Sequence, residues 1–257
     1  MKRWMVVVAV MAVSTTAKAM ADGEPEKAKA KPLARTLPTT RAHVLPPWEI
    51  EYEQWWRGTW ARGGGDSHLF RSEVEMGLPG RFHVAVYEDY ELTTQETFRH
   101  RSVDFEGRWA FADYGECLLN PTLYGEWKVK DEAPDAYELK LLLAEDLTEK
   151  WWWAFNVLYE QEVGGAREQE IGFTQALMYK IKGRSLAAGI EMKYEYATEN
   201  GSRDNPEQEV LVGPSVLCKL HDRVKVRTAP LFGVTGHSPH VQAFVLVEVE
   251  LWEPKGH

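Results

Sequence analysis

The chain has 257 residues and a formal net charge of −9 at pH 7. That acidity argues against a nucleic-acid-binding protein, because such proteins normally present a basic surface. Beyond the N-terminal region, no segment is apolar over the roughly 20 positions that a transmembrane helix requires. Composition therefore leaves two classes open, an exported soluble protein and a β-barrel that crosses a membrane with strands.

Residues 1–21 have the pattern of a secretory signal peptide. Lys2 and Arg3 precede a short apolar run, and small residues follow at Ala17, Ala19 and Ala21. The apolar run is too short to span a bilayer as a helix. We expect cleavage after Ala19 or Ala21 and export from the cytoplasm.

Residues 22–46 are rich in Lys, Ala and Pro and show no apolar periodicity. Such a composition is typical of a chain segment that builds no core of its own. We therefore expect a flexible periplasmic leader at 22–46, followed by one domain at 47–257.

From Trp48 onward, apolar and polar residues alternate in the manner of β-strands. The stretch EKWWWAFNVLYEQEVGG shows the pattern clearly, with Phe155 and Val157 on one face and Asn156 on the other. The alternation recurs about twelve times between turn signals. Tight turns such as LPGR, KGRS and LHDR alternate with longer polar connections such as TENGSRDNPEQ. This arrangement predicts an all-β, antiparallel domain.

The two faces of these strands differ in a way that suggests a membrane. The polar face carries full charges at mid-strand, whereas the apolar face carries almost none, and aromatic residues such as Trp60, Trp109 and Trp151 cluster near strand ends. Transmembrane barrels combine such aromatic girdles with an even strand number and short periplasmic turns. We predict an antiparallel transmembrane β-barrel of about 12 strands, with a soluble periplasmic β-fold as the alternative.

Three motifs resemble a known family. FRSEVEMGLPGRFHVAVYEDYEL is similar to the strand-turn-strand unit of bacterial outer-membrane proteins named for the MetA pathway of phenol degradation, and LNPTLYGEWKV and VLVGPSVLCKLHDRVKV are similar to later strands of that family. The resemblance spans roughly Trp48 to Trp252. It implies a transporter-like barrel in the outer membrane of a Gram-negative-type bacterium, with the lipid bilayer and the barrel-assembly machinery as partners.

A barrel of this kind would place the charged face in its lumen. The candidate lumen-lining and ion-selecting residues are Glu49, Glu51, Glu53, Arg71, Glu73, Glu75, Asp104, Glu106, Arg108, Glu126, Lys128, Glu191, Lys193 and Glu195. Carboxylates predominate, and an acidic lining raises the local concentration of cations. Because Arg71 is the only cation expected near the carboxylates of the first two strands, we expect some of these to remain unneutralised.

We therefore predict a narrow channel or transporter for small solutes, with a preference for cations. Two alternatives stay open. The charges could pair across strands and fill a closed structural barrel, or the protein could be a soluble periplasmic β-barrel that binds a ligand.

The sequence shows no sign of catalysis. It contains no Gly-x-Ser-x-Gly, His-Glu-x-x-His or phosphate-loop motif. His237, Ser238 and His240 bring a nucleophile between two bases, but they share one tight loop and cannot easily face each other. Two histidines alone make a poor metal site, and the cysteines Cys117 and Cys218 lie far apart in sequence. We expect no enzymatic activity, cofactor, metal ion or nucleic-acid partner.

Overall fold

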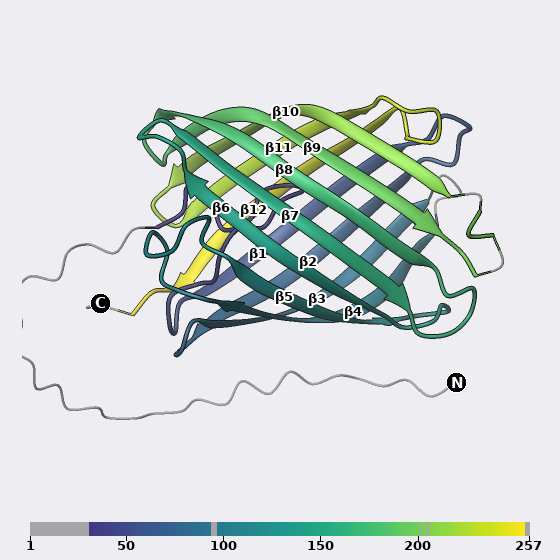
Figure 1. Ribbon diagram of the computed structural model, residues 1–257, viewed down its shortest axis with the longest axis horizontal. Helices are drawn as coiled ribbons and strands as arrows, with labels where there is room; N and C mark the ends of the chain where they lie inside the picture. Colours follow the sequence, from purple (N-terminus) through teal and green to yellow (C-terminus); the bar gives the residue numbers. More distant parts are fainter. Residues whose placement is uncertain (1–30, 94–96, 201, 205, 255–257) are drawn as a thin grey trace, which may run out of the picture.

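The computed structural model describes residues 31–93, 97–200, 202–204 and 206–254. Over these residues the chain forms a closed antiparallel barrel of twelve strands (Figure 1). The strands are β1 (Ile50–Trp60), β2 (Ser67–Leu78), β3 (Phe82–Thr93), β4 (Phe98–Ala110), β5 (Thr122–Lys130), β6 (Ala136–Asp146), β7 (Trp151–Glu162), β8 (Gln169–Lys182), β9 (Leu186–Thr198), β10 (Glu207–His221), β11 (Val224–Gly233) and β12 (Val241–Trp252). Each strand pairs with its neighbours in sequence, and β1 closes the barrel on β12. The predicted all-β barrel of about 12 strands is confirmed.

The register of the strands aligns side chains of one kind around the wall. Val157 on β7 lies opposite Leu141 on β6 and Phe173 on β8, which continue an apolar row on the outer face. The next position, Asn156, lies opposite Leu142 and Thr174 on the inner face. Val157 is 43% exposed and Asn156 is 2% exposed. The period-2 alternation of the sequence therefore separates an outer face from a lumen, as predicted.

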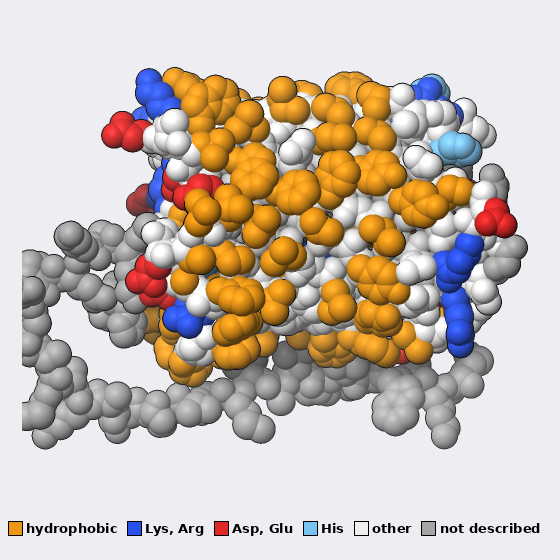
Figure 2. Space-filling view, viewed as in Figure 1, with side chains coloured by type: hydrophobic (Ala, Val, Ile, Leu, Met, Phe, Trp, Pro, Cys, Tyr) orange, Lys and Arg blue, Asp and Glu red, His pale blue; other side chains and the backbone are white. Residues whose placement is uncertain are grey.

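The outer face is apolar and the interior is charged. Figure 2 shows hydrophobic side chains over the middle of the wall and charged side chains at its two ends. Large apolar residues such as Phe105, Leu139 and Ile190 are exposed, whereas Glu51 and Arg108 are buried. A protein in water would have the opposite distribution. The wall is suited to contact with lipid, which contradicts the soluble alternative.

The two ends of the barrel differ in their connections. The tight turns at 79–81, 183–185 and 222–223 lie at one end, together with the start of β1 and the end of β12 (left in Figure 1). Gly80 and Gly183 adopt left-handed backbone angles there, with φ of 79° and 51°, as tight turns require. Longer connections such as 61–66, 163–168 and 234–240 lie at the other end. We call these the turn end and the loop end.

The chain enters the lumen from the turn end before it forms the first strand. Residues 32–45 are buried, apart from the half-buried Thr39. They form a narrow hairpin, in which Leu37 N donates to Thr40 O and Ala42 N donates to Arg35 O, both at 2.8 Å. Among the described residues no helix is long and apolar enough to cross a membrane. We call residues 32–46 the plug.

The plug corrects one expectation from the sequence. Residues 32–46 are packed inside the barrel and do not form part of a flexible periplasmic leader. The composition of this segment misleads because several of its contacts are with strands far away in sequence, such as the ion pair of Arg41 with Glu106. The signal peptide expected at 1–21 and residues 22–30 of the expected leader lie outside the described residues.

The outward position of Val157 gives a stability prediction. The change Val157→Arg should lower the free energy of unfolding by about 2–4 kcal/mol, because it places a cation against lipid near the middle of a strand. Urea titration of the protein folded in lipid vesicles, followed by tryptophan fluorescence, measures the loss. Val163→Arg, in an exposed position in the loop after β7, should change stability by less than about 0.5 kcal/mol. Equal losses at both positions would show that Val157 does not face lipid.

The two ends should face different compartments. Short turns belong to the periplasmic side of outer-membrane barrels, so Ser202→Cys at the loop end should react with a membrane-impermeant maleimide on intact cells. The background for this test carries Cys117→Ser and Cys218→Ser, since both native cysteines are free. Asp222→Cys at the turn end, where the side chain is 93% exposed, should react only after the outer membrane is permeabilised. The reverse labelling would invert the topology.

Candidate functional site

The first contact between the plug and the wall is made by Arg35. Its Nη1 atom lies 3.3 Å from Glu49 Oε1 and 3.2 Å from Glu51 Oε1. All three side chains are buried. A buried carboxylate is costly unless a cation and hydrogen bonds compensate for the lost water. Arg35 supplies that compensation at the point where the chain enters β1.

Arg41 makes the corresponding contact deeper in the lumen. Its Nη2 atom lies 3.1 Å from Glu73 Oε2 on β2 and 3.5 Å from Glu106 Oε2 on β4. The guanidinium carbon also lies 5.7 Å from the centre of the Trp55 ring, within the range of a cation–π contact. One plug arginine thus joins three strands of the wall.

The backbone of the plug tip is held by polar side chains of the wall. Asn156 Oδ1 accepts a hydrogen bond of 2.8 Å from Arg41 N, and Asn156 Nδ2 donates one of 2.7 Å to Arg41 O. Glu191 Oε2 accepts from Thr39 N at 2.8 Å and from Thr39 Oγ1 at 2.6 Å. Thr40 Oγ1 donates to Thr174 Oγ1 at 3.2 Å. These side chains take the place of a neighbouring strand for backbone groups that need partners when buried.

The remaining carboxylates of this half of the lumen pair with wall cations. Arg227 on β11 forms ion pairs with Glu248 and, at 3.9 Å, with Glu53. Arg108 pairs with Glu106 two residues away on the same strand and lies 3.7 Å from Glu75. These cations are shared between carboxylates, since Arg35 contacts both Glu49 and Glu51. Buried oxygens of Glu51, Glu53 and Glu75 have no hydrogen-bond partner among the described residues. The expectation that some carboxylates of the first two strands remain unneutralised stays a prediction. Arg71, the cation expected beside them, instead forms a two-point pair with Asp89, at 2.7 and 2.9 Å.

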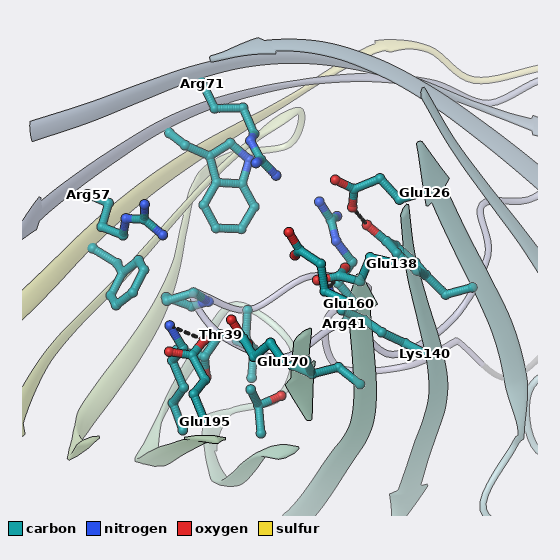
Figure 3. Close-up of a pocket in the computed structure, with 18 of the residues that line it drawn as sticks. Thr39, Arg41, Arg57, Arg71, Glu126, Glu138, Lys140, Glu160, Glu170 and Glu195 are labelled. Carbon is teal, nitrogen blue, oxygen red and sulfur yellow. Dashed lines mark hydrogen bonds and ion pairs between the residues drawn. The ribbon is translucent and has the colours of Figure 1, made fainter. Parts of the chain in front are cut away.

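A cavity of about 270 Å³ lies on the loop-end side of the plug tip (Figure 3). We call it the vestibule. Its charged lining residues are Arg41, Arg57, Arg71, Lys128, Lys140, Lys193, Glu126, Glu138, Glu160, Glu170 and Glu195. Leu37, Leu69, Leu158, Phe244 and Trp55 are among its other lining residues. The lumen thus has a filled half at the turn end and an open half at the loop end.

Many of the charges in the vestibule are already paired. Lys128 Nζ lies 2.6 Å from Glu160 Oε2, 3.5 Å from Glu126 Oε1 and 3.7 Å from Glu138 Oε2. Lys193 pairs with Glu195 at 2.5 Å, and Lys140 pairs with Glu138. Toward the loop end, Glu160, Glu162, Glu168 and Glu170 line a smaller cavity of about 50 Å³. Partial burial and the nearby Glu162 raise the pKa of Glu168 in this acidic rim.

The structure turns all the predicted lumen residues inward, in two groups. Glu49, Glu51, Glu53, Glu73, Glu75, Asp104, Glu106, Arg108 and Glu191 are buried, and Arg71, Glu126, Lys128, Lys193 and Glu195 line the vestibule. Their role in ion selectivity stays a prediction. Sequence reasoning missed Arg35 and Arg41, because nothing in the plug composition points to the lumen. It also missed Arg57, although this residue continues the inward series of Glu51, Glu53 and Trp55 on β1.

Two other groups in the described residues, a cluster of carboxylates that could bind a metal ion and a serine that could act as a nucleophile, already have partners. Glu49, Glu51 and Glu250 place carboxylate oxygens within 4.8 Å of one another, as a metal ion would require, but Arg35 already pairs with two of them. The Ser238 hydroxyl accepts from Val210 N at 2.8 Å and donates to Val210 O at 3.1 Å. It is therefore engaged with the backbone, and neither neighbouring histidine activates it.

No model of a known protein family matches the chain, so the resemblance to the MetA-pathway family stays a prediction. No curated protein matches it either. Several solved structures do share the fold. The COG4313 outer membrane channel from Pseudomonas putida F1 is 9% identical with a TM-score of 0.57, over 80% of this chain and 97% of that one. The NanC porin is 9% identical with a TM-score of 0.55, over 79% of this chain and 100% of that one.

The KdgM porin, solved in complex with disordered oligogalacturonate, gives a third match. It is 9% identical with a TM-score of 0.52, over 79% of this chain and 99% of that one. At this level of identity the similarity establishes the fold and not the solute. Together with the apolar outer face and the charged lumen, it identifies the chain as a twelve-stranded β-barrel of the outer-membrane type.

Proposed function

We propose that the protein is a narrow channel for small solutes in the outer membrane, and that the plug holds it closed. The observation that carries this proposal is the way the plug is attached. It fills the turn half of the lumen through side-chain contacts from Arg35, Thr39, Thr40 and Arg41. Its isolated bridge, Thr36 to Arg41, is internal to the hairpin. The plug can therefore leave without breaking the hydrogen-bond ladder of any strand.

Water can replace the plug as the partner of the wall charges. The carboxylates of Glu49, Glu51 and Glu73 gain plug arginines in the closed state and would gain water in an open one. Because both environments stabilise a carboxylate, the difference in free energy between them is smaller than the cost of burying the charge alone. This balance supports a closed state that can open.

The expected preference for cations belongs to the open state of this channel. Arg35 and Arg41 leave the wall when the plug leaves, whereas the carboxylates of β1, β2 and the residue before β1 remain. A lining with surplus carboxylates favours cations by raising their local concentration.

A permanently closed structural barrel is the second candidate. It is favoured by the wall ion pair of Arg227 and Glu248, which involves no plug residue. The two candidates differ in whether displacement of the plug produces a conducting pore.

A reversible covalent lock on the plug tests the channel. The pair Thr40→Cys and Thr174→Cys puts thiols in place of two hydroxyls that lie 3.2 Å apart, and oxidation should join them in a disulfide. With both native cysteines changed to Ser, the oxidised protein should show no conductance in planar bilayers. Addition of dithiothreitol should restore channel events. Absence of conductance both before and after reduction would favour the structural barrel, provided that the protein without the two new cysteines also shows no channel events.

The variant Asn156→Ala should favour the open state, and it is measured beside the disulfide-locked protein. It removes both hydrogen bonds to the backbone of Arg41. Because these backbone groups are buried, the loss should destabilise the closed state by about 1–3 kcal/mol. The open probability should therefore rise about 10-fold or more. The matched control is Gln161→Ala, on β7 with its side chain on the outer face, which should not change the open probability.

Selectivity of the open state gives a separate prediction. In the Asn156→Ala background, Glu51→Gln combined with Glu73→Gln should move the reversal potential in a salt gradient toward that of a non-selective pore, because two lining carboxylates are lost. Glu88→Gln removes one carboxylate from the exposed face of β3 and should leave the reversal potential unchanged. An unaltered potential in the double variant would contradict the cation preference while leaving the channel intact.

A further inference from the structure

Two charges in the vestibule lack the ion pairs that the others have. Arg41 pairs with Glu73 and Glu106, Arg71 pairs with Asp89, and each lysine pairs with at least one glutamate. Among the described residues, Arg57 on β1 forms no ion pair or side-chain hydrogen bond, and Glu170 on β8 forms no ion pair. Both line the cavity. The wall thus leaves one cation and one anion available to a bound molecule.

A second acidic side chain lies beside Glu170. The side chains of Glu170 and Glu195 lie within hydrogen-bonding reach of each other. Lys193 is the cation paired with Glu195, at 2.5 Å. An ammonium group placed between the two acidic groups would donate hydrogen bonds to both.

The available positive charge lies apart from these carboxylates. Figure 3 shows Arg57 and Arg71 at the left and top of the cavity and Glu170 and Glu195 below it. Glu138 and Glu160 lie at the right, beside the cations Arg41 and Lys140. Because Asp89 already neutralises Arg71, Arg57 is the guanidinium best able to bind an additional anion. A guanidinium binds a carboxylate with two parallel hydrogen bonds, which fixes its orientation.

The balance of charge excludes a simple ion as the best ligand. The vestibule is lined by six cationic side chains and five carboxylates, so its net charge is close to zero, and among the described residues Arg57 and Glu170 are the two of these charges without an ion-pair partner. Such an arrangement attracts a dipolar molecule more than a single charge of either sign. A volume of about 270 Å³ falls just below the roughly 300–1,000 Å³ of pockets for drug-sized ligands.

We propose that the vestibule binds small zwitterions of the amino-acid type, with the carboxylate on Arg57 and the ammonium group between Glu170 and Glu195. The apolar side chains of Leu69, Leu158 and Phe244 would contact the uncharged part of the molecule. The identity of the solute as a zwitterion rests on the proposed channel function, because the vestibule is the part of the lumen that a solute from the loop end meets before the plug. Binding itself does not require the channel to open.

Three matched probes test the proposal on the full chain. L-Alanine is the zwitterion, L-alaninamide lacks the negative charge and N-acetyl-L-alanine lacks the positive charge. Binding is measured by saturation-transfer NMR titration at low ionic strength, with the oxidised Thr40→Cys, Thr174→Cys protein in detergent. L-Alanine should bind at least 10-fold more tightly than either analogue. Equal affinity for the three probes, or no detectable binding of L-alanine, would overturn the proposal.

Two variants assign the two ends of the ligand. Arg57→Gln should weaken L-alanine binding about 10-fold and leave the binding of L-alaninamide, which has no carboxylate, unaffected. Glu170→Gln should also weaken L-alanine binding about 10-fold, but it should leave the binding of N-acetyl-L-alanine, which has no ammonium group, unaffected. Arg99→Gln and Glu88→Gln, both exposed outside the vestibule, serve as matched controls and should change nothing. Unchanged L-alanine affinity in both vestibule variants would refute the site. Since the locked protein does not conduct, this result is independent of whether plug release opens a channel.

Discussion

The structure depends on the cost of burying carboxylates inside a barrel. Glu51 and Glu53 on β1 lie opposite Glu75 and Glu73 on β2, and these carboxylates would repel one another in a dry lumen. Arg35 and Arg41 remove that repulsion by bringing guanidinium groups from a segment that is not part of the wall. Plug and water are therefore two alternative partners for the same charges. The position of the plug follows from this electrostatic requirement more than from any shape of its own.

The wall side chains that face the plug also explain why it remains a separate segment. Asn156, Thr174 and Glu191 satisfy individual groups at the plug tip. A strand inserted into the sheet would satisfy the same groups through a continuous ladder, at the cost of reopening the barrel. Side-chain hydrogen bonds, each worth about 0.5–1.5 kcal/mol net, hold the plug, together with the apolar contacts of Leu33, Leu37 and Ala42, which are buried in one hydrophobic cluster with wall residues.

The barrel could be predicted from the sequence because the alternation that marks each strand lies within a few neighbouring residues. The alternation of Asn156 and Val157 is visible within one strand, and it assigns the first side chain to the lumen and the second to lipid. The same rule would have found Arg57, two positions beyond Trp55. The plug could not be predicted in this way, since Arg41 is 32 residues from Glu73 and 65 from Glu106. A charge pair over such distances leaves no periodic trace in the chain.

The excess of carboxylates over cations in the whole lumen does not show how the two kinds of charge are distributed along it. Most of the buried carboxylates lie beneath or beside the plug, where Arg35, Arg41, Arg108 and Arg227 approach them. The vestibule beyond the plug tip holds nearly equal numbers of both signs. A solute arriving from the loop end would meet the acidic rim first, then the balanced vestibule, and, if the plug has left, the carboxylates beneath it. Net charge summed along the strands does not describe the vestibule, so in the proposed channel the binding of a solute and the selectivity of the open pore would depend on different residues.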